Sequence, residues 1–83
     1  MYLYLGSETV INTKDIIGIF DLDNASTTRA TKLYLTAAQR NGAVVNVTDD
    51  LPKSFVVCEK NSRPKVYLSQ ISPATLKKRM RYP

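Results

Sequence analysis

The chain contains no histidine and no tryptophan, and Cys58 is its single cysteine among 83 residues. Without histidine, a Ser-His-Asp or Cys-His catalytic mechanism is excluded, and an ordinary zinc site lacks ligands. One cysteine cannot form a disulfide within the chain, and no secretory signal is recognisable, so the sequence predicts a reducing, cytoplasmic location. We expect no catalytic residues, no metal site and no enzyme activity.

Glycine is scarce, and long apolar runs are absent. The three glycines stand far apart, so no glycine-rich phosphate loop exists. The apolar start, Met1–Leu5, is too short for a signal peptide or a membrane span, and it is better interpreted as a buried strand. These absences predict no cofactor, no small-molecule substrate and no membrane partner.

The remaining candidates for chemistry have simpler structural interpretations. Cys58 lies within an apolar segment with no basic neighbour, which favours a buried small hydrophobe over a reactive thiol. The acidic pairs occur at strand ends or in loops, where carboxylates usually satisfy turns rather than act as acid and base. These pairs are Asp21 with Asp23 and Asp49 with Asp50.

Positive charge is concentrated in the second part of the chain. The formal net charge is +5, but residues 29–83 hold eleven Lys or Arg against three acids. Such asymmetry indicates an anionic partner, either a nucleic acid or a membrane surface. The small size of the chain also predicts a marginal core, for which oligomerisation is the expected supplement.

Apolar periodicity predicts strands over most of the chain. Residues 2–5 and 9–12 are expected to form a hairpin with a three-residue loop. The segment "DIIGIFDL" has apolar residues on both faces, which predicts a central strand, and Gly18 within it indicates a bulge or a close backbone approach. Three further strands are expected at "AVVNV", "FVVCE" and "KVYLSQI", with the acidic "TDDLPK" as an exposed loop.

Two helices complete the prediction. A stripe at helical spacing predicts a long helix at about residues 28–41 whose apolar face packs on the core, and Asn41-Gly42 ends it. Ser72-Pro73 predicts the start of a short helix at about 73–80, with Leu76 and Met80 facing inward. The apolar stripe of the long helix is Ala30, Leu33, Tyr34, Ala37 and Ala38. The predicted fold is α+β, a small antiparallel sheet with these two helices in a single domain spanning 1–83.

The basic residues have two interpretations. A stripe on the long helix, formed by Arg29, Lys32 and Arg40 with Thr36, would suit phosphate binding, although a solvated helix face looks the same. The cluster at the C-terminus also complements the helix dipole, so its charge is partly structural. Only Tyr82 among the aromatic residues accompanies basic residues in the sequence, which favours duplex backbone contact over single-strand stacking.

The order of several segments resembles a known family. The segments are "MYLYLG", "DIIGIFD", a helix closing in "RNG", "LPKSFVV" and "VYLSQISPATLKKRM". Together they resemble the extracellular matrix regulatory protein family, RemA and RemB, over nearly the whole chain. The opening "MYLYLG" and the "PKS" are more similar to the RemB branch. The resemblance implies a small DNA-binding transcription regulator of biofilm-matrix genes, a homo-oligomer that forms a ring and wraps DNA around its rim.

We therefore expect an oligomeric regulator that contacts duplex DNA mainly through phosphates. The predicted DNA-binding residues are Arg29, Lys32, Arg40, Lys53, Lys77, Lys78, Arg79 and Arg81. A self-assembling interaction module without DNA binding is the alternative. It is favoured by Asp15, Asp50 and Leu51, which stand where the RemA branch has arginines, whereas Lys32 matches a lysine of that branch. An RNA-associated protein is a third possibility, because composition does not separate RNA from DNA.

Overall fold

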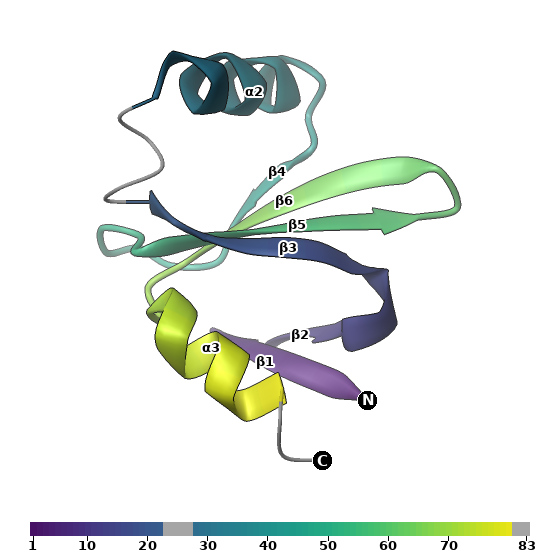
Figure 1. Ribbon diagram of the computed structural model, residues 1–83, viewed down its shortest axis with the longest axis vertical. Coiled ribbons are helices and arrows are strands. Elements are labelled where there is room, and N and C mark those ends of the chain that lie inside the picture. Colours follow the sequence, from purple (N-terminus) through teal and green to yellow (C-terminus); the bar gives the residue numbers. More distant parts are fainter. Residues whose placement is uncertain (23–27, 81–83) are drawn as a thin grey trace.

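The computed structural model describes residues 1–22 and 28–80. A twisted sheet occupies the middle of the molecule, with helix α2 on one side and a β-hairpin with helix α3 on the other (Figure 1). The structure contains helices, and its strands pair mostly antiparallel with one parallel pair, so the predicted α+β class is confirmed.

The central sheet has the strand order β3-β5-β6-β4. Strands β3 (Ile16–Asp21), β5 (Ser54–Lys60) and β6 (Arg63–Ser69) pair antiparallel in turn, whereas β4 (Val44–Asn46) runs parallel to β6. The sheet is therefore mixed. The reason is that β3 and β4 are joined through α2, and a helical crossover of this kind connects strands that run in the same direction.

Strands β1 (Tyr2–Gly6) and β2 (Thr9–Asn12) form the hairpin, and a short 3₁₀ turn at Thr13–Asp15 leads into β3. The loop is tighter than the three residues expected, because Gly6 pairs with Thr9 and leaves only two residues in the turn. These two residues have φ values of 46° and 63°. Positive φ at both positions is typical of the type I′ turn, whose twist matches that of the strands it joins.

Strand β3 lies at the edge of the sheet, so its prediction as a central strand is wrong. Ile17 and Phe20 are 62% and 42% exposed. Apolar residues on both faces of a strand therefore show neither that both faces are covered nor how many strands pair with it. Gly18 lies at a bulge, as predicted, and a Cβ there would be 2.7 Å from the ring of Phe20. That ring stacks on Phe55 with the centroids 5.0 Å apart.

Helix α2 (Arg29–Arg40) begins and ends close to the predicted positions. Thr28 caps it, because its Oγ1 accepts a hydrogen bond from the Thr31 amide at 3.2 Å. At the other end, the amides of Gly42 and Ala43 donate to carbonyls of the last turn at 3.1 and 2.9 Å. Gly42 has a φ of 70°, the left-handed conformation that this kind of helix end requires.

Helix α3 (Pro73–Met80) also begins where the sequence predicts. The Thr75 amide donates to Oγ of Ser72 at 3.3 Å, so Ser72 is the capping residue. Leu76 is fully buried and Met80 is half-buried, which confirms that these two residues face inward. Through this pair, α3 packs against β1 and β3.

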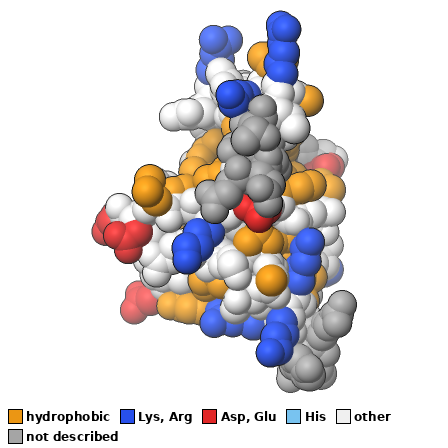
Figure 2. All heavy atoms as spheres, turned by 60° about the vertical axis from the view of Figure 1, so that its left-hand side comes forward, with side chains coloured by type: hydrophobic (Ala, Val, Ile, Leu, Met, Phe, Trp, Pro, Cys, Tyr) orange, Lys and Arg blue, Asp and Glu red, His pale blue; other side chains and the backbone are white. Residues whose placement is uncertain are grey.

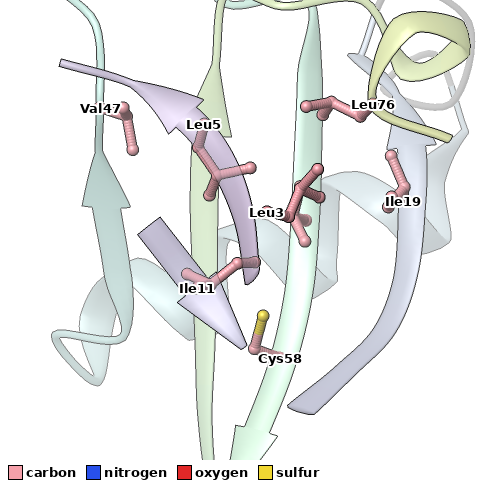
Figure 3. Close-up of a cluster of buried hydrophobic side chains, with 8 residues drawn as sticks. Leu3, Leu5, Ile11, Ile19, Val47, Cys58 and Leu76 are labelled. Carbon is pink, nitrogen blue, oxygen red and sulfur yellow. The ribbon is translucent and has the colours of Figure 1, made fainter. Parts of the chain in front are cut away.

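Two apolar clusters hold the three layers together. The larger one lies between the sheet and the layer made by the hairpin and α3 (Figure 3). Its members are Leu3, Leu5, Ile11, Ile19, Val47, Val56, Cys58 and Leu76. The smaller one lies between the sheet and α2, and its buried members are Ala38, Phe55, Val57 and Val66. Helix α2 contributes only Ala38 to the buried members of this cluster, so few of its side chains are packed against the sheet.

Cys58 is buried in the larger cluster, as predicted. Burial, and secondarily the carboxylate of Asp15, raise the pKa of the Cys58 thiol from its ordinary 9.0 to about 11. Burial also raises the pKa of the neighbouring Tyr67. Cys58 is therefore an uncharged thiol at neutral pH, and it acts as a small apolar side chain.

This raised pKa predicts a loss of stability in alkaline solution. The unfolded chain loses the thiol proton near pH 9, whereas the folded chain keeps it to about 11. Between these values the unfolded state binds fewer protons, so the free energy of unfolding falls as the pH rises. Urea denaturation at several pH values measures the decline. The Cys58→Ala variant should show a shallower decline, because the contribution of the thiol is removed, and an identical slope in both proteins would contradict the assignment.

Candidate nucleic-acid interface

Helix α2 contacts the sheet through a narrow stripe. Ala38 is buried, and Thr31 and Leu35 are half-buried, while the rest of the helix is exposed. These three residues are spaced by four and three positions, so they lie on one side of a helix with 3.6 residues per turn. The rest of the helix surface faces outward.

The apolar stripe predicted to face the core is largely exposed, so that part of the prediction is wrong. Leu33 is 60% exposed and Tyr34 is 43% exposed, and Ala30 and Ala37 are exposed as well. Only Ala38 of the predicted stripe is buried. Helical spacing shows that a stripe is apolar, but the connections to β3 and β4 decide which stripe meets the sheet. We call Ala30, Leu33, Tyr34 and Ala37 the outer apolar stripe.

The predicted basic residues of α2 also face solvent. Arg29, Lys32 and Arg40 are exposed and lie away from the stripe that contacts the sheet. Helix α2 therefore presents a basic stripe and the outer apolar stripe side by side, with the sheet on the third side. The two outward stripes offer separate surfaces for an anion and for an apolar partner.

The predicted basic residues of α3 lie at the other end of the molecule. Lys77, Lys78 and Arg79 are exposed, because burial of Leu76 and Met80 turns the rest of this helix outward. Arg81, the last of the predicted residues, lies outside the described part of the chain.

Lys53 is the predicted basic residue that belongs to neither helix. Its amide donates to the carbonyl of Ser69 at 2.8 Å, and its carbonyl accepts from the Leu22 amide at 3.0 Å. These bonds fix Lys53 at the end of the sheet where β3 leads toward α2 and β6 leads toward α3. The side chain is exposed.

Figure 2 shows the basic groups on one face of the molecule. Lys and Arg side chains project at the top, where α2 lies, and others lie in the lower half, toward α3. Acidic side chains are visible at the left margin, at the right edge and in the middle of this view, between the upper and lower basic groups. Within residues 1–22 and 28–80, none of the predicted basic residues forms an ion pair. Their charges are therefore available to an external anion.

A groove between β1 and α3 brings aromatic and basic side chains together. It has a volume of about 470 Å³. Its lining residues are Tyr2, Leu3, Tyr4, Thr75, Lys78 and Arg79. From the sequence, only Tyr82 among the aromatic residues was expected beside basic residues, and that interpretation is wrong for Tyr2 and Tyr4. The alternation of outward Tyr2 and Tyr4 with buried Leu3 and Leu5 was visible in the sequence, but the neighbouring helix was not.

A wider hollow of about 950 Å³ lies near the tip of the β5–β6 hairpin. Lys60, Arg63, Lys65 and Asp15 are among its lining residues, and it contains none of the predicted DNA-binding residues. In the part of the chain that the structure describes, no group of three acidic or cysteine side chains is arranged to hold a metal ion. No helix among those residues is long and apolar enough to cross a membrane.

Comparison with known proteins identifies the family. The model of the RemA-like family, described as extracellular matrix regulatory protein A-like, matches residues 3–80. The chain belongs to the RemA-like family. Extracellular matrix regulatory protein B of Bacillus subtilis strain 168 is 37% identical over 82 residues, which cover 99% of this chain and 93% of that protein. The resemblance to the RemA-like family stated from the sequence is therefore confirmed. Both helices with their basic residues lie inside the matched region.

Proposed function

We propose that this chain is an oligomeric regulator of extracellular matrix gene expression that acts in the cytoplasm and binds duplex DNA through backbone phosphates. Its similarity to extracellular matrix regulatory protein B supports the regulatory role. The absence of histidine supports a role without catalysis. The observation that carries DNA binding is the set of exposed, unpaired basic residues on α2, at Lys53 and on α3.

The electrostatics favour phosphate contact over base recognition. The basic groups of α2 and α3 are distributed along a molecule whose longest dimension is 35 Å. Each DNA strand carries one phosphate per about 3.4 Å of helix axis, so spread charges of this kind reach several phosphates of one duplex. Contacts of this type orient a protein on DNA without reading its sequence.

The outer apolar stripe of α2 supports self-association. Leu33 and Tyr34 are exposed on helix α2, which buries few side chains against the sheet. Ile17 is exposed on the open edge strand β3. Apolar helix faces and open strand edges are features that proteins usually cover. A ring built from such contacts would repeat the basic groups of each subunit around its rim, which raises the local positive charge.

Replacing three basic residues tests the proposal. The wild-type protein is expected to shift a labelled duplex in an electrophoretic titration at low salt, with log K falling by about 0.9 per phosphate contact for each unit of log salt. The Lys77→Ala/Lys78→Ala/Arg79→Ala variant should bind more weakly. Its salt slope should decrease by about 3, because each residue contributes about one contact.

A matched control removes the same charge elsewhere. Lys60→Ala/Arg63→Ala/Lys65→Ala changes the net charge equally at the β5–β6 hairpin, and it should leave the slope near the wild-type value. Equal losses in both variants would mean that net charge, and not the α3 surface, governs binding. No shift of duplex DNA by the wild-type protein at low salt would contradict the proposal.

The alternative is an interaction module that assembles without binding DNA. The exposed loop before β5 favours it, because Asp49, Asp50 and Leu51 in this loop are exposed and Leu51 is 89% so. Mass in solution, measured together with the duplex titration, separates the two functions. Assembly without DNA affinity favours the module, whereas salt-dependent DNA binding by the assembled protein favours the regulator. Structured RNA belongs in the same titration, because phosphate contacts alone do not distinguish it from DNA.

A further inference from the structure

The outer face of β1 exposes two aromatic rings. Tyr2 is 70% exposed and Tyr4 is 48% exposed. The alternating residues Leu3 and Leu5 are only 2% and 0% exposed. Alternate residues of a strand point to opposite faces, so burial of the leucines fixes both tyrosines on the outside. Residues two apart on one face are separated by about 7 Å, so the two rings stand at about that spacing.

Helix α3 supplies a basic wall beside these rings. Thr75, Lys78 and Arg79 line the groove opposite β1. Their spacing of three and four positions places them on one side of the helix. Leu76 is fully buried and anchors this helix in the larger cluster. The wall therefore has a fixed orientation relative to the tyrosines.

We propose that this groove binds single-stranded nucleic acid, with bases stacked on Tyr2 and Tyr4 and phosphates bound by Lys78 and Arg79. Aromatic side chains next to cations are the combination that single-strand binding requires. The spacing argues against a duplex, because stacked bases are separated by about 3.4 Å, roughly half the distance between the two rings. An extended single strand can present successive bases at the larger spacing.

Charge complementarity favours a polyanion over a second copy of the chain in this groove. Neither Lys78 nor Arg79 forms an ion pair within the described residues. Lys78 and Arg79 are the charged residues that line the groove, so its charge suits an anion. The inference deepens the proposed function, since the two cations also belong to the proposed duplex surface, but the tyrosines do not.

Fluorescence anisotropy with labelled twelve-nucleotide oligo-dT and oligo-rU tests the proposal. The Tyr2→Thr/Tyr4→Thr variant keeps residues that favour strands and removes both rings. It should bind both oligonucleotides about thirty-fold or more weakly, since each stacked base contributes at least about a five-fold affinity gain. Tyr2→Phe/Tyr4→Phe retains the aromatic faces and should restore most of the affinity. The chain has no tryptophan, so quenching of tyrosine emission provides a second readout.

Val10→Thr is the control, because Val10 is 54% exposed on strand β2 of the same hairpin but does not line the groove. It should leave oligonucleotide affinity unchanged. Circular dichroism confirms that each variant is folded. Equal single-strand binding by wild type and the threonine variant, or no binding by wild type, would overturn the proposal. A changed mass with unchanged oligonucleotide affinity would assign the groove to a second copy, and would overturn it too.

A parallel titration with duplex DNA distinguishes this inference from the proposed function. The threonine variant should bind duplex DNA within about two-fold of wild type, because paired bases do not reach the rings. An equal loss on duplex and single strands would overturn the stacking arrangement. Tyrosine-dependent single-strand binding without any duplex binding would support the groove and contradict the duplex proposal.

Discussion

The Leu76→Ala variant is expected to lose about 2 to 5 kcal/mol of stability, which is a large part of the total for a domain of this size. Leu76 is fully buried in the larger cluster, where α3 meets the hairpin and the sheet. Removing its side chain leaves a cavity and weakens the attachment of α3. Urea denaturation followed by circular dichroism measures the change.

Leu51→Ala is the matched control for this variant. Leu51 is 89% exposed, so the same chemical change should cost less than about 0.5 kcal/mol. Similar costs for the two variants would show that α3 does not pack as described. Since α3 carries part of the proposed DNA surface and one wall of the groove, the Leu76→Ala variant should also bind both kinds of nucleic acid more weakly.

The Ser69→Ala variant is expected to lose about 2 to 4 kcal/mol, because a buried carbonyl and a partly buried amide lose their partner. Ser69 is fully buried, and its Oγ donates to the carbonyl of Leu5 at 2.7 Å. The same oxygen accepts from the Ile71 amide at 3.1 Å. This hydroxyl links β6 to β1 and shapes the chain just before α3. Denaturation measures the cost, and faster hydrogen exchange at the Ile71 amide would locate it.

Ser54→Ala provides the graded control. Ser54 is equally buried, but its Oγ makes one such bond, to the carbonyl of Ile71 at 2.8 Å. Its replacement should therefore cost less than that of Ser69. If Ser54→Ala proves as costly as Ser69→Ala or more so, the second hydrogen bond of Ser69 does not contribute as described.

These two variants concern the same junction, and the junction connects stability to function. The hairpin, the end of β6 and α3 meet there, and the groove opens on its outer side. Tyr2 and Lys78 keep their relative positions only while Leu76 and Ser69 hold this junction together. The groove is therefore expected to be among the features most sensitive to changes in the core.

Element boundaries were predictable where a local signal existed. Ser72-Pro73 predicted the start of α3, and Asn41-Gly42 predicted the end of α2. Both signals depend on hydrogen bonds or backbone angles within a few residues, so the sequence contains all the participants. The basic residues of α2 and α3 were predicted to be exposed for a similar reason, since charged side chains without partners stay in water.

Predictions that required knowledge of distant partners were less successful. The edge position of β3 and the exposure of Leu33 and Tyr34 depend on how the crossover through α2 is placed over the sheet. Periodicity describes the pattern within one element, and it carries no information about which neighbour covers an apolar face. The parallel pairing of β4 with β6 was missed for the same reason.

The sequence by itself determined the α+β class, the helix caps, the buried thiol, the family and the excess of positive charge. Only the tertiary structure decided that Tyr2 and Tyr4 stand beside Lys78 and Arg79, because residues from opposite ends of the chain meet through the packing of α3 on β1. Local backbone preferences depend on near neighbours in the sequence, so short segments are enough to predict them. A shared groove depends on how whole elements pack, and that is settled by the burial of their apolar faces against one another.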